Sequence, residues 1–372
     1  DVTGLATLRT AYRDRLAAAR RAAARGKRVI GLVGHCVPVE LVWAAGCFAV
    51  QLTPSGHGPT PAADGFMEEQ LDRDTRSLFD RFLRGEFDFC AGVVIAATSD
   101  ANRHLFHYVR EVARQGVRDT LPPLHAFDMM FGDLPALRHY GLDRMRELAR
   151  FLRLIGGHDI EPRLDAVFAM AHRRRTALQR LDRLRRARLV SGVDAIHAIG
   201  AGSFLEPESC QAELEAALTT FEGAAPLSGA RTIIVPAVPL HDDRLHRLVE
   251  DAGVVVIAED DTWGARPAAD ELAGPPTMDS LFAAYHAAAA APRAPAAQRE
   301  AWLRRRLREG GIDLVVVYIP PDDQDFGWSY PALRDLLDGH GLRHIAIREN
   351  ADDPAAAATI ARQLAAKIGM PA

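Results

Sequence analysis

The sequence predicts an α/β protein in which two doubly wound parallel-sheet domains flank a helical middle section. Near both ends of the chain, short apolar runs alternate with helical segments, which is typical of parallel sheets covered on both faces. Between them, Arg- and Ala-rich helical stretches occupy residues 138–222. The chain has 372 residues, too many for one ordinary core. We therefore expect domains over 1–137, 138–228 and 229–372.

The first domain is expected to begin with an amphipathic helix over the N-terminal 27 residues. The run KRVIGLVG then predicts a buried strand, and VELVWAAG predicts a helix that ends at Gly46. Pro38 fits the first turn of this helix, where its missing N–H costs no hydrogen bond. The expected elements are strands over 27–34, 47–53, 87–98 and 121–130, and helices over 39–46, 66–84 and from 99 onward.

The C-terminal part repeats this order after the helical section. Four strands are predicted by ARTIIVPAVPL, VVVIAED, GIDLVVVYIPP and LRHIAIREN. The segments that begin FDFCAGVVIAATSD and GIDLVVVYIPPDD share a layout of Asp, apolar run, polar turn and helix, so we interpret the two ends as copies of one domain. The expected helices cover 241–253, 329–341 and 353–369, and a loop or helix joint rich in Ala and Pro covers 288–297.

Charge and cysteine content exclude several classes of protein. The net charge of −4 argues against nucleic acid or an anionic membrane as the main partner, so we interpret the Arg-rich run as a solvated helix face. No apolar run is long enough to span a membrane, and the N-terminal stretch lacks the apolar core of a signal peptide. Cys36, Cys47, Cys90 and Cys210 are scattered without a C-x-x-C pair, so we expect a reduced, cytoplasmic protein.

In doubly wound sheets, ligands bind beyond the carboxyl ends of the strands. The sequence contains no G-x-G-x-x-G after a strand, no phosphate-binding P-loop and no H-E-x-x-H. Nicotinamide, nucleotide-hydrolysis and zinc-protease chemistry therefore lack support. We expect the cleft to be lined by the turns that follow the predicted strands, namely 34–38, 53–57, 97–104, 236–242, 259–264 and 319–328.

The first of these turns carries three candidate catalytic residues. His35 has a side chain suited to proton transfer, although a turn histidine can also simply bond to the backbone. Cys36 precedes a helix N-terminus, which lowers the pKa of a thiol, and the alternative is a small half-buried side chain. Glu40 falls in the first helical turn, where it either points into the site or stabilises the helix dipole.

Two other turns carry candidate substrate-binding residues. Ser99 and Asp100 lie where an apolar strand turns into a helix, so they serve either as the helix N-cap or as contacts to an anionic ligand. Asp260 and Trp263 follow a buried strand, in a loop whose Gly264 allows close approach of a ligand. We assign these four residues to substrate binding and no residue to a metal ion.

The ordered set of segments resembles one known family. In that family, a strand is followed by P-x-E-L and A-A-G, and the similar segment here is GLVGHCVPVELVWAAGCFAVQL. Another strand of the family is followed by T-C-D-x-x-R, and the similar segment here is FDFCAGVVIAATSDANRHL. AGVVVIAEDDTWGAR is similar to G-A-x-V-V-x-D-D-x-x-G, and GIDLVVVYI with the following helix to the last segment. The family is the 2-hydroxyacyl-CoA dehydratase component D group, whose relatives include benzoyl-CoA reductase subunits and double-cubane cluster proteins.

This resemblance implies two flavodoxin-like domains with a helical part, and a subunit that usually pairs as a heterodimer. Family members typically hold an iron–sulfur cluster on three cysteines, and a separate ATP-dependent activator supplies one electron. The thioester substrate then becomes a ketyl radical and loses its hydroxyl group. The resemblance also implies that Glu40 corresponds to the glutamate of the family's P-x-E-L segment.

The sequence departs from the family at all three cysteine positions. Ser99 stands where the family has the cysteine of T-C-D, and the other two segments, LDRDTRSL and PPDDQDFGWSYP, contain no cysteine. Thiolates are the ordinary ligands of such clusters, so we expect none bound by conventional ligands in this chain. A [4Fe–4S] cluster would then belong to a paralogous partner subunit.

The leading hypothesis is a dehydratase-like, lyase-type subunit that contributes substrate cleft and dimer interface. Its partner would be a cluster-bearing paralogue or a second copy of the same chain, served by an ATP-dependent activator. One alternative is a cluster-free enzyme of the same fold that acts on an acyl-thioester or small acid through the candidate residues. The other alternative is a non-catalytic scaffold subunit.

Overall fold

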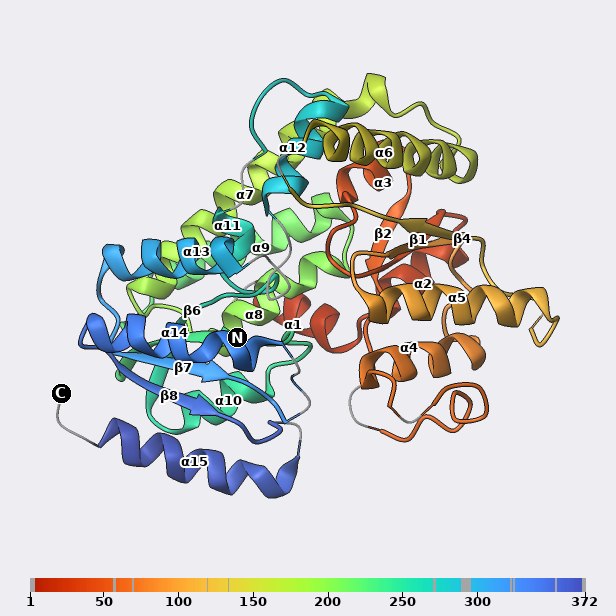
Figure 1. Ribbon diagram of the computed structural model, residues 1–372. Coiled ribbons are helices and arrows are strands. Elements are labelled where there is room, and N and C mark those ends of the chain that lie inside the picture. Colours follow the sequence, from red (N-terminus) through yellow and green to blue (C-terminus); the bar gives the residue numbers. More distant parts are fainter. Residues whose placement is uncertain are drawn as a thin grey trace.

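The structure is a computed structural model that describes residues 4–55, 58–68, 70–118, 120–132, 134–269, 272–288, 296–321, 323, 325–351 and 353–369. The described residues form two four-stranded parallel sheets with helices between and around them (Figure 1). The strand orders are β2-β1-β3-β4 and β6-β5-β7-β8, so both halves have the same topology. The prediction of two doubly wound, flavodoxin-like units with a helical middle section is confirmed.

In the first sheet, β1 lies between β2 and β3, and β3 also pairs with the edge strand β4. Every residue of β1 and β3 is buried, as expected for central strands covered on both faces. The elements of this half are β1 Val29–Val33, α3 Val39–Ala44, β2 Phe48–Gln51, α4 Arg73–Leu83, β3 Gly92–Ala96, α5 Asp100–Arg114 and β4 Leu124–Phe127.

The second sheet repeats this arrangement, with β5 between β6 and β7 and with β8 at the edge. Ile233 and Val235 pack against α13 and α14, whereas Ile234 faces α10 and α15 on the opposite side. The elements are β5 Ala230–Pro236, α10 Arg244–Asp251, β6 Val254–Glu259, α11 Arg266–Ala269, α12 Met278–Ala288, α13 Ala296–Glu309, β7 Leu314–Tyr318, α14 Phe326–Gly339, β8 Arg343–Ile347 and α15 Pro354–Ile368.

The helical section lies between the two sheets (Figure 1). Its helix α7 contacts α3 of the first half and β6 of the second, while α6 packs against β4 and against α12 from the C-terminal half. The N-terminal helix α1 packs on α8 and α9. The domain boundaries after residues 137 and 228 stay predictions. The helices are α1 Leu5–Arg13, α2 Ala17–Ala24, α6 Pro135–Gly156, α7 Leu164–Arg186, α8 Gly192–Gly200 and α9 Pro207–Glu222.

Several elements are shorter than the sequence predicts. The N-terminal amphipathic stretch forms two helices, α1 and α2, because the helix is interrupted at Asp14. Helix α4 begins at Arg73, because the carboxylate of Asp72 accepts a hydrogen bond from the Thr75 N–H (3.0 Å) and caps the helix there. Strand β3 begins at Gly92, since turns occupy the preceding residues. The joint predicted over 288–297 lies mostly outside the described residues.

The Arg-rich run is only partly the solvated face that the sequence predicts. Arg185 of α7 is 1 % exposed and forms an ion pair with Glu259 at the end of β6. The His246 ring of α10 bonds to the same carboxylate at 2.7 Å. A buried carboxylate needs such partners, because an unpaired charge in the interior is very costly. These contacts fasten the helical section to the second sheet.

A second set of polar contacts joins the two halves directly. The Arg15 guanidinium, between α1 and α2, donates to Thr53 Oγ1 after β2 (3.0 Å) and to the His241 carbonyl after β5. The His241 ring bonds to the Asp74 carboxylate of α4 at 2.9 Å. Thr53 and His241 both follow strands, so the carboxyl ends of the two sheets face the same region of the molecule.

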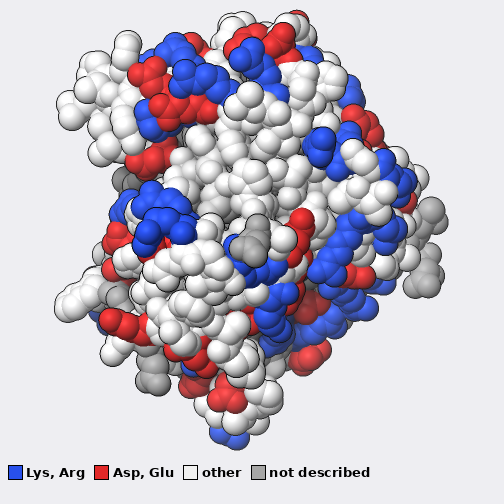
Figure 2. Space-filling view, turned by 90° about the vertical axis from the view of Figure 1, so that its right-hand side faces the viewer, with Lys and Arg blue, Asp and Glu red and all other residues white. Residues whose placement is uncertain are grey.

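The surface carries both signs of charge. Figure 2 shows Lys and Arg side chains interspersed with Asp and Glu on one face, around a large uncharged area. This mixture fits a chain with 45 basic and 49 acidic residues. Among the helices that the structure describes, none combines the length and the apolar character needed to cross a membrane.

Candidate functional site

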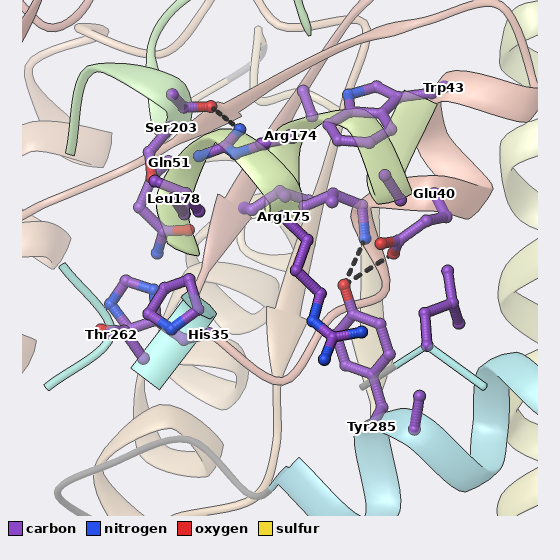
Figure 3. A pocket seen from close by; sticks show the side chains of 18 of the residues that line it. His35, Glu40, Trp43, Gln51, Arg174, Arg175, Leu178, Ser203, Thr262 and Tyr285 are labelled. Atoms are coloured by element: carbon purple, nitrogen blue, oxygen red, sulfur yellow. Dashed lines mark hydrogen bonds between the residues drawn. The ribbon is translucent and has the colours of Figure 1, made fainter. Parts of the chain in front are cut away.

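A cavity of about 270 Å³ lies where the carboxyl ends of both sheets meet the helical section. His35 and Cys36 reach it from the turn after β1, and Glu40 from the first turn of α3. Trp263 reaches it from the loop after β6, and Tyr285 from α12. Figure 3 shows Glu40 beside Tyr285 at one side of the cavity and His35 at the other. The volume is close to the lower end of the range for small-molecule pockets, which begins at roughly 300 Å³.

The turn after β1 depends on Gly34. Its φ is +83°, a left-handed value that favours glycine. A Cβ at this position would lie 2.9 Å from the Ala96 Cβ and 3.0 Å from the Asn102 side-chain nitrogen. Glycine therefore lets the β1 turn pass close to the end of β3 and the start of α5, and it directs His35 and Cys36 toward the cavity.

Glu40 and Tyr285 form the polar pair of the cavity. The Tyr285 hydroxyl donates to Glu40 Oε2 at 2.7 Å and accepts from the Val39 N–H at 3.2 Å. Burial raises the pKa of Glu40, and the hydrogen bond from Tyr285 acts in the opposite direction. A raised pKa favours the protonated carboxyl group, which is the form that a general acid requires.

His35 has the complementary property. Burial lowers the pKa of His35 to about 4, and the positive charge of His241 acts in the same direction. The imidazole is therefore neutral at pH 7 and can accept a proton. Its ring meets the Trp263 indole edge to face, with 6.0 Å between the ring centroids. The cavity thus contains a candidate base and a candidate acid supplied by one turn and the helix after it.

The cysteines do not form a cluster site. Cys36 is half-buried at the cavity, and the Thr98 hydroxyl lies 3.8 Å from its sulfur. The other three are buried in separate places, and burial raises the pKa of Cys47 to about 11 and of Cys90 to about 12. Cys210 lies in the core of the helical section.

Two of the three segments that match the family's cysteine segments form helix caps, one at Ser99 and one in LDRDTRSL. Ser99 caps α5 by accepting a hydrogen bond from the Asn102 N–H at 3.3 Å, and Thr75 takes part in the capping contacts of α4. Across the described residues, no group of three or more His, Cys, Asp or Glu side chains is arranged to hold a metal ion. A conventional cluster needs several thiolates at one place, so the described residues do not fit one.

The predicted substrate-binding residues separate into two groups. Trp263 lines the cavity, whereas Ser99, Asp100 and Asp260 do not. Asp100 is exposed and pairs with Arg103 of the same helix. Asp260 is 1 % exposed and accepts hydrogen bonds from two arginines, Arg266 (2.5 Å) and Arg299 (3.4 Å). Contact of these three residues with a substrate stays a prediction.

Trp263 is held in the cavity wall from several sides. Its indole Nε1–H donates to Ser203 Oγ at 3.1 Å, and Ser203 lines the same cavity. The Arg15 guanidinium carbon lies 5.0 Å from the indole ring centroid and also packs on the rings of Tyr12 and Phe204. The wall of the cavity is therefore coupled to the contacts that join the two halves.

Sequence reasoning missed the contributions of α7 and α12. Ala171, Arg174, Arg175 and Leu178 all line the cavity, and their spacing of three and four residues places them on one face of α7. That spacing is a signal, because apolar residues at 171 and 178 mark an inward face that includes two arginines. Tyr285 has no comparable signal, since it lies in an apolar helix 245 residues after Glu40.

Comparison with known proteins identifies the family. A family model described as 2-hydroxyglutaryl-CoA dehydratase, D-component, matches residues 35–369. A search of curated proteins finds no match. The matched span begins after β1 and includes the other strands of both sheets, the helical section and the cavity residues from His35 to Tyr285. The resemblance inferred from the sequence segments is confirmed, and the chain belongs to the 2-hydroxyglutaryl-CoA dehydratase D-component family.

Proposed function

We propose that the chain is a subunit of a 2-hydroxyacyl-CoA dehydratase-type enzyme and that the cavity is part of its substrate cleft. Family membership makes the chain a dehydratase-type component. The observation that carries the proposal is the meeting of His35, Glu40 and Tyr285 in one cavity beyond the carboxyl ends of the strands. Ligands of doubly wound folds bind at that edge of the sheet.

The iron–sulfur cluster belongs, in this proposal, to a paralogous partner subunit. Cys36 is the cysteine at the cavity, and the turn at Ser99, beside it, supplies a hydroxyl where the family has a thiolate. A single thiolate does not hold a four-iron cluster with ordinary ligands. The partner would contribute the cluster and receive electrons from an ATP-dependent activator, and this chain would contribute cleft and interface. The proposal also implies that the enzyme is a cytoplasmic lyase and that its substrate is an acyl-CoA.

The residues of this chain then handle protons and position the substrate. The neutral His35 accepts a proton from the substrate, and Glu40 donates one to the departing hydroxyl group, which leaves as water. Tyr285 holds the Glu40 carboxyl in place through its 2.7 Å hydrogen bond. The β-hydrogen of a 2-hydroxyacyl thioester is not acidified by the carbonyl, so these groups need the electron that the partner supplies.

A second candidate function is a cluster-free enzyme of the same fold. It is favoured by the acid and base that this chain places in one cavity without a set of thiolates. Acid–base catalysis alone removes water from a 3-hydroxyacyl thioester, whose α-hydrogen is acidified by the carbonyl group. A non-catalytic scaffold subunit is the third candidate, and it predicts that the cavity residues can be replaced without effect on activity.

The deciding experiment measures iron, acid-labile sulfide and the visible spectrum of anaerobically purified protein. The chain is purified alone and co-expressed with a cysteine-complete paralogue. We expect no iron in the chain alone, about four irons or more per pair, and dehydration of a 2-hydroxyacyl-CoA only by the pair with its activator. About four irons in the chain alone would overturn the assignment of the cluster to the partner. Dehydration of a 3-hydroxyacyl-CoA by the iron-free chain would establish the second candidate.

A variant of the acid separates catalysis from assembly. Glu40→Gln removes the proton donor but keeps a hydrogen-bonding side chain at that position. We expect the pair to keep its iron and its association, and dehydration to fall by roughly 10²- to 10⁴-fold, the usual contribution of a positioned general acid. Unchanged activity would support the scaffold interpretation.

A further inference from the structure

One end of the cavity is built around Arg174. This residue lies on the face of α7 that also presents Arg175 and Leu178 to the cavity. It is half-buried, so its guanidinium is partly removed from water. Its field reaches Glu40 across the cavity, where it acts to lower the pKa of that carboxyl against the larger effect of burial.

The guanidinium of Arg174 lies against the backbone of a short 3₁₀ helix, η2, at Ala201–Ser203. The Arg174 Nη1–H donates to the Gly202 carbonyl at 3.1 Å. A Cβ at position 202 would lie 2.0 Å from Arg174 Nη2, 2.4 Å from Cζ and 2.6 Å from Nη1. Every non-glycine residue at 202 would therefore displace the guanidinium from this position.

The hydrogen bond to Gly202 uses one of the five N–H groups of the guanidinium. Within the described part of the chain, no carboxylate lies within ion-pair distance of Arg174. Arg185 of the same helix and Arg266 of α11, by contrast, are each paired with a carboxylate. Arg174 is therefore arranged to bind an anionic group that comes from outside the chain.

We propose that Arg174 recognises a carboxylate group on the ligand of the cavity and that Gly202 positions Arg174 for this contact. An N–H edge of a guanidinium matches the two oxygens of a planar carboxylate. The ligand is therefore a small carboxylic acid, or an acyl group that ends in a free carboxylate, with its reacting carbons near Glu40 and His35. This inference rests on the proposed function, since it takes the cavity to be the substrate site.

The test uses two small probes of nearly the same shape. Butyrate carries a carboxylate, and butyramide replaces it with a neutral amide. Trp43 and Trp263 line the cavity, so quenching of tryptophan fluorescence reports binding of either probe to the full chain. We expect butyrate to bind roughly 10- to 100-fold more tightly than butyramide, as expected for a hydrogen-bonded ion pair. Inorganic phosphate serves as a third probe.

Three variants assign the preference to particular residues. Arg174→Gln should abolish the preference for butyrate over butyramide, and Gly202→Ala should reduce it by a similar factor. If Gly202 acts through Arg174, then Gly202→Ala should have no further effect in the Arg174→Gln background. Gly339→Ala is the matched control, because a Cβ at this exposed helical position meets nothing within 4 Å. It should leave the preference unchanged.

Equal binding of the two probes, or a preference that survives in Arg174→Gln, would overturn the inference. Phosphate binding with no butyrate binding would overturn the choice of a carboxylate. A Gly202→Ala variant that is less stable but retains the preference would show that Gly202 has only a structural role. These outcomes are separate from those for the proposed function, because dehydration by the pair can fail while the preference stands, and the preference can fail while dehydration stands.

Discussion

The two sheets have the same strand order, yet their carboxyl edges differ in what their side chains do. At the first sheet, the turn after β1 and the start of α3 direct His35 and Glu40 into the cavity. At the second sheet, the carboxylates after β6 are buried, and Glu259 and Asp260 are each paired with arginines. Glu259 and Asp260 are each 1 % exposed.

This difference shows how one fold can divide two functions between its copies. In the first half, the edge of the sheet holds groups whose pKa values are shifted by burial and that face empty space. In the second half, the same edge fastens α7 and α13 to the sheet through Arg185 and Arg299. Substitutions of Glu259 or Asp260 should therefore affect folding, whereas substitutions of His35 or Glu40 should affect ligand binding.

The largest expected effect is on the second edge. Glu259→Gln leaves the buried Arg185 without its carboxylate, and a buried charge without its partner costs about 3–5 kcal/mol. We expect the free energy of unfolding, measured by urea denaturation, to fall by that amount. Asp100→Asn at the first edge is the control, because its ion pair is exposed. The free energy of unfolding of this variant should equal that of the wild type within error. A loss below about 1 kcal/mol in Glu259→Gln would contradict the anchoring function.

The next prediction concerns Asp261, which directly precedes the cavity residues Thr262 and Trp263. Burial raises the pKa of Asp261 from its ordinary 3.8 to about 7. The unfolded chain therefore releases this proton at a lower pH than the folded chain. The free energy of unfolding of the wild type should fall as the pH rises from about 4 to about 7, and this loss should persist at higher pH. Asp261→Asn removes this loss.

We expect Asp261→Asn to match the wild type near pH 4 and to exceed it by at most about 4 kcal/mol at pH 8. Urea denaturation at a series of pH values measures the difference. A difference that does not change with pH would show that the Asp261 carboxyl is not buried in the protonated form.

A smaller effect is expected at the polar pair of the first edge. Tyr285→Phe removes the hydroxyl that donates to Glu40 and accepts from the Val39 N–H, so the pKa of Glu40 should rise further. The lost hydrogen bonds should lower the free energy of unfolding by about 1–2 kcal/mol. Tyr140→Phe is the matched control, since the Tyr140 hydroxyl bonds to Asp128 away from the cavity. Equal effects on butyrate binding in both variants would contradict a function for Tyr285 in the cavity.

The smallest effect distinguishes a helix cap from a substrate contact. Ser99 caps α5 and Ser191 caps α8 in the same way, each by accepting a backbone N–H from three residues later. Replacement by alanine should cost about 1 kcal/mol in both cases and leave butyrate binding unchanged. Thermal and urea denaturation measure the cost. Weaker binding in Ser99→Ala alone would restore the prediction that Ser99 contacts the substrate.

The strands, and their arrangement as two copies of one domain, could be predicted because the relevant signals are local. Continuous apolar runs such as VIGLV and LVVVY identify buried parallel strands, and the polar turns after them identify the edge where ligands bind. The turn that carries His35, Cys36 and Glu40 was located in this way. The start of α4 was predicted too early, because a helix begins at its cap and not where its polar pattern begins.

By itself, the sequence determined the α/β class, the repeated order of elements, the family and the turn that carries His35, Cys36 and Glu40. These follow from short-range periodicity, from turn chemistry and from the order of segments along the chain. Only the tertiary structure decided that Tyr285 meets Glu40, that Glu259 is paired with Arg185, and that Gly202 supports Arg174. Each of these contacts joins segments at least 28 residues apart in the chain. Which arginine of a run is paired, exposed or turned toward a cavity depends on what packs against it, and no local pattern records that.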